Sequence, residues 1–250
     1  FQALCPFHDE KTPSFTISRE KQFYHCFGCS AHGSAIGFLM NYRNLEFIEA
    51  VEELAQIAGL EVPREAGRER AVPTREVFEL LEQACGYYET QIRNHADRGR
   101  IVDYLKARDI SGQIAKKFRL GFAPAGWNNL LTAMSTDGAG EEQLERAGLA
   151  IRREHGGYYD RFRERIIFPI RDRRGRVIGF GGRVIDAGEP KYLNSPETPL
   201  YSKSNHLYPL NVTRDEIRRR DFAILVEGYF DCIIPLQLGI PNIVASLGTS

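Results

Sequence analysis

The chain has 250 residues, of which 42% are hydrophobic and 26% are charged, a composition typical of a soluble globular protein. No apolar run approaches the roughly 20 residues that a membrane-spanning helix needs, so we expect no membrane protein. Basic and acidic residues balance at 33 each, and this zero net charge argues against a protein that coats nucleic acid with its whole surface. The length is enough for one large domain or for two to three smaller ones.

Two short pairs of cysteine and histidine near the start of the chain predict a metal site. The four candidate ligands are Cys5, His8, Cys26 and Cys29. Two residues stand inside each pair, and the 17 residues between the pairs leave room for two antiparallel strands. This spacing fits a tetrahedral structural zinc site in a ribbon. Four protein ligands leave no open position, so we expect no catalysis by this zinc.

A disulfide, or two unrelated thiol pairs, is the alternative interpretation of these cysteines. The chain has five cysteines, an odd number, no signal peptide opens it, and Cys85 and Cys232 stand singly. This usage indicates a reducing cytosol, where paired knuckles favour a metal over disulfides. His25 and His32 lie nearby and compete for the histidine position, but His8 is preferred because it repeats the two-residue spacing.

Aromatic and basic residues are mixed along the predicted ribbon. They are Phe7, Lys11, Phe15, Arg19, Lys21, Phe23, Tyr24 and Phe27. Such a mixture suits single-stranded nucleic acid, because bases stack on rings and cations bind phosphates. The alternative is that so small a ribbon needs its rings as a core. We take Phe23 and Tyr24 as the candidates for base stacking.

Helices are expected after the ribbon. They are predicted at residues 35–40, 47–58, 74–93, 99–107 and 111–118. The second has apolar residues on one helical face from Phe47 to Ala58, and Gly59 ends it. Residues 61–74 contain two prolines, a glycine and mixed charges, a composition that predicts a linker. Thr74 is the expected N-cap of the long helix that follows.

A mostly β stretch is expected next. Strands 165–171 and 177–182 are joined by a turn that contains Gly175, which predicts a hairpin. Residues 151–186 contain ten arginines against five acids, a local excess that predicts an electropositive track. The alternative is an ordinary solvated hairpin face. Residues 190–210 look irregular, and a loop of this length inside a compact domain is usually functional.

The last part of the chain predicts a β-α-β unit, with a buried strand at 222–226, a helix at 233–238 and a second strand at 243–247. Glu227 stands at the carboxyl end of the first strand, where ligands and metals gather in open α/β sheets, and Asp231 follows in the next turn. Two such carboxylates can hold Mg²⁺. The alternative is that Glu227 caps the next helix and Asp231 is a solvated acid in its first turn.

Three groups of segments stand out together. They are Cys5–Phe15 with Tyr24–Cys29; Tyr159–Arg165, Gly179–Arg183 and Lys191–Thr198; and Val226–Asp231 with Ala245–Thr249. The combination resembles the bacterial replicative DNA primases of the DnaG type. The first group is similar to the zinc-binding domain of that family, the second to the amino-terminal half of its RNA polymerase domain, and the third to the start of its Toprim subdomain. The resemblance covers nearly the whole chain.

The resemblance implies a DNA-dependent RNA polymerase of the bacterial cytoplasm, which makes short primers for replication by metal-dependent nucleotidyl transfer. It implies that Glu227 is the first acid of a Toprim site for Mg²⁺ or Mn²⁺ and that Asp231 is a neighbouring acid. It also implies contacts to nucleic acid or nucleotide by Arg108, Arg161, Arg163, Arg183, Lys191, Asn194 and Lys203. The implied partners are single-stranded template DNA, RNA primer, nucleoside triphosphates and, in the full-length protein, the replicative helicase.

The expected fold is multidomain α+β. A zinc ribbon with helices is predicted for residues 1–60, a linker for 61–74, a mixed α+β polymerase subdomain for 75–220 and the start of an α/β Toprim subdomain for 221–250. Toprim folds carry a D-x-D motif after a later strand, which this sequence does not reach, so we expect this piece alone to make no primers. Two other functions stay open. One is a non-catalytic zinc-ribbon module that binds single-stranded DNA, and the other is a different Toprim enzyme such as a topoisomerase.

Overall fold

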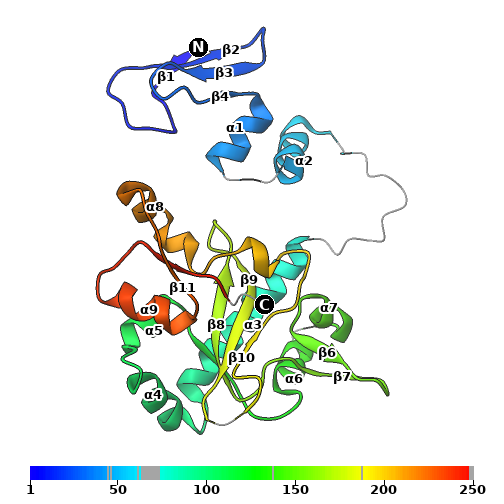
Figure 1. Cartoon of the computed structure of the whole chain (residues 1–250). Coiled ribbons are helices and arrows are strands. Elements are labelled where there is room, and N and C mark those ends of the chain that lie inside the picture. The colour runs from blue at the N-terminus through cyan, green and yellow to red at the C-terminus, as the bar shows by residue number, and fades with distance from the viewer. Residues whose placement is uncertain are drawn as a thin grey trace. The chain divides into compact units, whose positions relative to one another are not determined.

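The computed structural model of the chain (Figure 1) describes residues 1–43, 45, 47–60, 62, 74–136, 138–186 and 188–247. The chain divides into two compact units, Phe1–Glu69 and Arg70–Ser250, each with its own hydrophobic core. The linker predicted at 61–74 lies outside the described residues apart from positions 62 and 74. Within the described ranges, none of the helices has the length and apolar character needed to cross a membrane.

The first unit is an antiparallel ribbon followed by two helices. Its elements are β1 (Gln2–Ala3), β2 (Phe15–Ser18), β3 (Phe23–Cys26), β4 (His32–Gly33), α1 (Ala35–Tyr42) and α2 (Phe47–Ala58), and the strands pair in chain order. The bounds of α2 confirm the predicted helix. Gly59 follows it at a φ of 65°, a left-handed conformation that suits glycine after a helix end. The ribbon core holds Phe15, Tyr24 and Cys26, with Phe38 of α1 packed against them.

The second unit is organised by an antiparallel sheet in the order β10-β9-β8-β5. Its elements are α3 (Thr74–Asn94), α4 (Arg98–Lys106), α5 (Gly112–Lys117), β5 (Gly121–Ala123), α6 (Asn129–Thr136), α7 (Glu141–Arg146), β6 (Ala150–Arg152), β7 (Tyr158–Asp160), β8 (Arg165–Arg171), β9 (Val177–Val184), β10 (Tyr192–Asn194), the 3₁₀ turn η1 (Lys203–Asn205), α8 (Leu210–Arg220), β11 (Ile224–Val226), α9 (Tyr229–Gln237) and β12 (Ile243–Ala245). The predicted helices α3, α4 and α5 and the predicted β8–β9 hairpin are confirmed.

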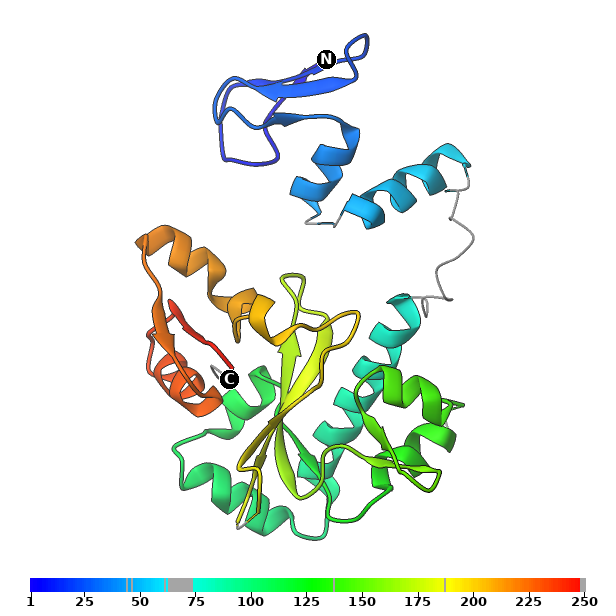
Figure 2. The ribbon, with the colours of Figure 1, turned by 45° about the vertical axis from the view of Figure 1, so that its right-hand side comes forward.

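Both faces of this sheet are covered, which explains the unbroken apolar run in β8. Successive side chains of a strand point to opposite faces. Ile167 belongs to the core cluster that contains Leu81 and Tyr88 of α3. The next residue, Phe168, belongs to the other cluster, and its ring stacks on that of Tyr229 in α9 with centroids 4.5 Å apart. Figure 2 shows α3 and α9 on either side of the sheet.

Helices α6, α7 and α8 are not predicted from the sequence, and the expectation of a mostly β stretch after residue 118 is wrong in these places. The start of α6 shows the reason. The buried carboxylate of Asp160, in β7, accepts hydrogen bonds from the backbone N–H groups of Leu130 at 2.8 Å and Leu131 at 3.0 Å. The groups that begin this helix are therefore satisfied from about 30 residues away, by a carboxylate that the local sequence does not reveal.

The predicted β-α-β unit is confirmed, since β11 and β12 pair in parallel and α9 lies between them in the chain. The prediction that the first strand is buried is wrong, because Leu225 is 65% exposed. In the described part of the chain β11 pairs only with β12, so the strand is open to solvent. Residues 248 and 249, which end one of the segments similar to primases, lie outside the described residues.

Candidate metal centre and nucleic-acid interface

The two knuckles of the first unit bring four ligand atoms together. The ligand atoms of Cys5, His8, Cys26 and Cys29 all lie within 4.8 Å of one another. Cys5 Sγ is 3.7 Å from Cys29 Sγ, and His8 Nδ1 is 3.8 Å from Cys26 Sγ. Zinc–sulfur bonds of about 2.3 Å at tetrahedral angles place two sulfurs about 3.8 Å apart. The four groups therefore fit a zinc ion with little rearrangement.

The two competing histidines lie outside this cluster. The rings of His25 and His32 are 6.0 Å apart, and His25 packs against Phe27 at 4.6 Å. His32 Nδ1 lies 2.8 Å from the carbonyl oxygen of Ser30. Of the three candidate histidines, the structure thus brings only His8 to the cysteines.

Hydrogen-bond donors surround the sulfur of Cys26. The N–H groups of Gly28 and Cys29 each approach it at 3.4 Å, and Ser14 Oγ lies 3.1 Å away, with its one proton shared between this sulfur and the carboxylate of Glu10. Burial by itself raises the pKa of the Cys26 thiol, but these donors outweigh it and bring the pKa to about 6. Zinc binds the thiolate, so the surroundings favour the metal at neutral pH. Residue 28 has to be glycine, because a Cβ there would lie 2.7 Å from His8 Nε2.

Glu10 braces the first knuckle, although no sequence pattern singles it out. Its Oε1 accepts hydrogen bonds from the N–H groups of Cys5 at 2.7 Å and Ser14 at 3.0 Å. Its Oε2 accepts the Ser14 hydroxyl and lies 3.3 Å from His8 Nε2. The bond from the Ser14 hydroxyl lowers the pKa of Glu10, which keeps it ionised. A carboxylate on one imidazole nitrogen leaves the other, Nδ1, free to face the metal.

The two rings proposed to stack on bases differ in exposure. Phe23 is 38% exposed, whereas Tyr24 is 4% exposed and stacks on Phe15 with centroids 5.2 Å apart. The base-stacking prediction for Tyr24 is therefore wrong, because the pleat of β3 turns this ring into the ribbon core. Phe27 in the second knuckle is 74% exposed and joins Phe23 as an accessible ring.

Five of the predicted nucleic-acid-binding residues line two hollows of the second unit. Arg108, Arg183 and Lys191 line one of about 610 Å³, and Arg161 and Arg163 line another of about 260 Å³. Val184 and residues 188–190 border both hollows. The arginine excess predicted for residues 151–186 therefore gathers only in part, since Arg152 pairs with Glu145 at 3.1 Å and does not line either hollow.

Aromatic rings of α4 and α9 lie under two of these arginines. The guanidinium of Arg108 lies 3.7 Å from the ring centroid of Tyr104, and that of Arg183 lies 5.4 Å from the same ring. Both also lie over Phe230, at 5.8 and 5.6 Å. Arg108 Nη1 donates to the Tyr104 carbonyl at 3.4 Å and Arg183 Nε donates to the Tyr192 hydroxyl at 3.0 Å. Stacking and these bonds aim each guanidinium, whose remaining N–H groups can bind phosphate. Phe230 directly precedes Asp231, so one of the rings under these arginines belongs to the helix that carries the acid.

Arg161 and Asn194 make internal hydrogen bonds. Arg161 donates to the Asn194 carbonyl from Nη2 at 2.9 Å and from Nε at 3.1 Å, and burial lowers its pKa. The Asn194 side chain donates to the Leu247 carbonyl at 2.9 Å and accepts the Tyr229 hydroxyl at 2.7 Å. Asn194 thus ties β10 to α9, and a nucleotide contact by it stays a prediction. Lys203 lies in η1 and is not among the residues that line the two hollows.

Trp127 and Tyr159 form an aromatic site beside Arg163. No sequence motif predicts this site. The two rings meet edge to face at 5.4 Å. Arg163 lies 4.5 and 5.0 Å from their centroids, and Arg153 lies 5.4 and 5.2 Å away. Trp127 is 55% exposed, so the site can receive an unstacked base and its phosphate. The one available signal is that the single tryptophan stands in a turn-like stretch with proline, glycine and asparagines, residues 124–129, with no apolar period to bury it.

Glu227 and Asp231 occupy the strand end that the sequence predicts, and both are exposed. Glu227 follows β11, Gly228 is the N-cap of α9, and Asp231 lies in its first turn. The Asp231 carboxylate folds back over Gly228, where a Cβ would meet its Oδ2 at 2.7 Å. Carboxylates of this kind suit Mg²⁺. Among the described residues, neither acid belongs to a group of three or more possible metal ligands.

A zinc-ligand cluster in a ribbon, arginine-lined hollows with exposed rings and an acidic strand end are features typical of zinc proteins that handle nucleic acid. Comparison with known families makes the class specific. The profile described as CHC2 zinc finger matches residues 1–70, and the profile of the DNA primase catalytic core, N-terminal domain, matches residues 87–214. The chain belongs to the DNA primase family.

Known primases are similar along the chain. The DNA primase of Pseudomonas putida is 52% identical over 100% of this chain and 39% of that protein. The zinc-binding and RNA polymerase domains of Aquifex aeolicus primase match with a TM-score of 0.64 at 36% identity, over 99% of this chain and 60% of that one. A DnaG primase catalytic domain bound to single-stranded DNA matches with a TM-score of 0.65 at 40% identity, over 70% and 56%.

The chain spans about two fifths of the length of the curated relatives that it matches. The α+β fold expected from the sequence is confirmed by these structures. The zinc-finger match and the cysteine–histidine cluster together show one structural zinc.

Proposed function

We propose that this chain is the template-binding part of a bacterial DNA primase, which makes short RNA primers on single-stranded DNA. The observation that carries the proposal is that Arg108 and Arg183, which line one basic hollow, both lie over Phe230 of α9, the helix whose first turn carries Asp231. Nucleotidyl transfer needs both features in one place, because the phosphates have to be neutralised where the new bond forms.

The template strand would follow the rings and arginines of the second unit. Trp127 and Tyr159 offer faces on which bases stack, and Arg153 and Arg163 offer donors for the backbone between them. Contacts to phosphate position a strand without reading its bases, so a polymerase can move along any sequence through such a site. Arg161 stabilises this surface by donating a hydrogen bond to the carbonyl of Asn194.

Glu227 and Asp231 would hold Mg²⁺ or Mn²⁺, which when bound lowers the pKa of the attacking 3′-hydroxyl and neutralises phosphate charge. In this chain, Glu227 after β11 and Asp231 in the first turn of α9 would present the two oxygen ligands. In the described part of the chain, neither acid belongs to a group of three or more possible metal ligands, so we expect the 250 residues alone to bind template and make no primers. Primer synthesis by the purified chain with template, nucleotides and Mg²⁺ would sink this expectation.

The ribbon would help to choose start sites by binding single-stranded DNA. Its zinc has four protein ligands and acts structurally. Phe23 and Phe27 are the accessible rings, so Phe23→Ala should weaken template binding by the isolated chain while zinc stays bound. Unchanged template binding in this variant would show that Phe23 of the ribbon does not contact the template. The same proposal extends to the longer protein. We propose that it lies in the cytoplasm, binds nucleoside triphosphates and the RNA primer, and contacts the replicative helicase.

Template binding can be measured through the single tryptophan of the chain. A base that stacks on Trp127 should quench its fluorescence when an oligodeoxythymidylate is added. Arg163→Ala should weaken the binding of that oligonucleotide about ten-fold, within the range that single stacking and phosphate contacts contribute. Arg173→Ala is the matched control, because Arg173 is an exposed arginine outside both hollows. Equal losses in the two variants, or binding without quenching, would refute this template path.

A further inference from the structure

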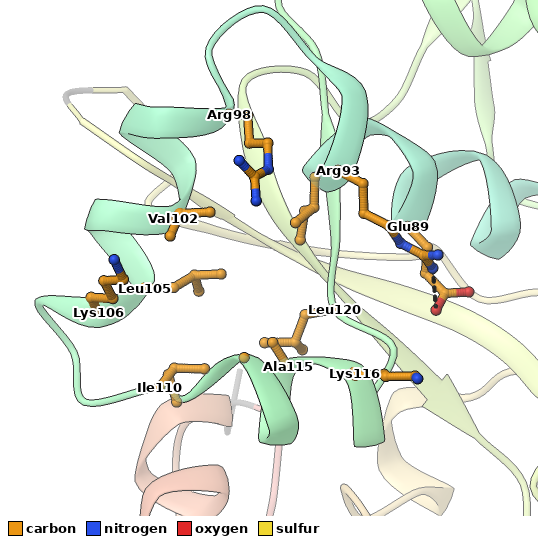
Figure 3. A pocket seen from close by; sticks show the side chains of 12 residues that line it. Glu89, Arg93, Arg98, Val102, Leu105, Lys106, Ile110, Ala115, Lys116 and Leu120 are labelled. Atoms are coloured by element: carbon orange, nitrogen blue, oxygen red, sulfur yellow. Dashed lines mark ion pairs between the residues drawn. The ribbon is translucent and has the colours of Figure 1, made fainter.

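An apolar groove opens between α3, α4 and α5, as Figure 3 shows, with a volume of about 480 Å³. Its aliphatic lining consists of Ile92, Val102, Leu105, Ile110, Ala115 and Leu120. Voids in protein interiors are rarely much larger than a water molecule, whereas binding pockets are commonly about 300–1,000 Å³, so this groove has the size of a binding site. None of the residues assigned above to zinc, template or catalytic metal lines it.

Positive charge surrounds the apolar floor. The cations at the rim are Arg93, Arg98, Lys106 and Lys116, and all four are exposed. The one acid of the lining, Glu89, is already engaged by Arg119 at 2.8 Å and by Arg93 at 3.6 Å. Within the described residues, Arg98, Lys106 and Lys116 have no ion-pair partner. A rim with this much uncompensated charge attracts an anionic ligand.

The walls of the groove are braced in advance. Arg119, which follows α5, donates to Glu82 at 2.5 Å and to Glu89 at 2.9 Å, and both acids belong to α3. Leu105, Ile110 and Leu120 are themselves buried members of the main core. A groove that is already formed costs little ordering entropy when it receives a ligand.

We propose that this groove docks an acidic amphipathic helix of a partner protein. An aliphatic floor without aromatic rings or amide side chains offers nothing that stacks on bases or reads their edges, which argues against nucleic acid. A helix laid into such a groove would insert aliphatic anchors one turn apart. Arg98 and Lys106 stand at the two ends of α4, about 12 Å apart along its axis at 1.5 Å per residue. They therefore match acids about two turns apart on the partner.

The test uses the whole 250-residue chain and a fluorescein-labelled peptide of about four helical turns. The peptide carries leucines at positions i, i+4 and i+7 and glutamates on both flanks, and a second peptide has lysines in place of the glutamates. Anisotropy gives the affinity of each. Ala115→Phe fills the groove without a change of charge, and Arg98→Glu with Lys106→Glu reverses the rim. Lys117→Glu is the matched control, because Lys117 follows Lys116 on α5, is exposed and does not line the groove.

The acidic peptide should bind, and the filled groove and the reversed rim should each weaken it about ten-fold, whereas Lys117→Glu should leave its affinity unchanged. Trp127 fluorescence shows that each variant is folded. The proposal is overturned if the acidic peptide does not bind, if the lysine peptide binds as well, or if Lys117→Glu weakens binding as much as the groove variants. Competition by an oligodeoxythymidylate would assign the groove to nucleic acid instead. Since no step measures primer synthesis, the proposal stands or falls independently of the primase function.

Discussion

Replacing Tyr229 by phenylalanine removes one hydroxyl from the junction of β10 and α9, which carries the acidic strand end. That hydroxyl donates to Asn194 Oδ1 at 2.7 Å. The ring is 3% exposed and stacks on Phe168, so phenylalanine keeps the packing and loses only the hydrogen bond. A partly buried acceptor left without its donor costs about 1–3 kcal/mol. We expect a loss of about 1.5 kcal/mol in the free energy of unfolding, or about 3–6 °C in the melting temperature of the second unit.

Tyr201→Phe is the matched control, since Tyr201 is 1% exposed and its hydroxyl has no hydrogen-bond partner among the described residues. Its removal should change stability by less than about 0.5 kcal/mol. Urea unfolding followed by Trp127 fluorescence measures both variants, because the single tryptophan reports on the second unit. Equal losses of stability in the two variants, or full stability of Tyr229→Phe, would refute the claim that the hydrogen bond from Tyr229 to Asn194 stabilises this junction.

Three further predictions concern the zinc shell, the two cores and the sheet. Glu10→Gln should speed zinc transfer to a chelator about ten-fold, because an amide holds the zinc-bound imidazole of His8 less well than a carboxylate does. Asp9→Asn, at the exposed neighbouring residue, should leave the rate of transfer unchanged. Equal rates in the two variants would show that Glu10 does not support the zinc ligands. Zinc removal should unfold the first unit and leave Trp127 fluorescence native, and a loss in both units would contradict separate cores. Gly181→Ala should cost about 1–3 kcal/mol, because its Cβ would overlap the Tyr229 hydroxyl; a melting temperature like the parent's would contradict that close approach.

Local patterns predict the elements whose signals lie within a few residues. Helix α2 has the predicted bounds because one apolar face repeats along it and Gly59 stops it. The β8–β9 hairpin turns at Gly175, whose φ of 83° needs a glycine. The zinc ligands belong to the same class, since each knuckle is a tight local turn and only the pairing of the two knuckles is tertiary.

The exposure of a side chain depends on what packs against it, and the sequence alone does not report this. Phe23 and Tyr24 are adjacent rings in one strand, yet one is accessible and the other is core. The apolar run at 222–226 suggests a buried strand, but β11 has one neighbour in the described part of the chain and is open to solvent.

The sequence by itself determined the donor set for zinc, the arginine excess and the acids at a strand end, because spacing and composition are local properties. Only the tertiary structure decided which of these residues work together. Arg163 meets Trp127, the Asp160 carboxylate begins α6 from 30 residues away, and Tyr229 finds Asn194 across 35 residues. These residues become neighbours because the sheet packs between α3 and α9. That packing depends on side chains from many separate segments, so no single stretch of the sequence predicts it.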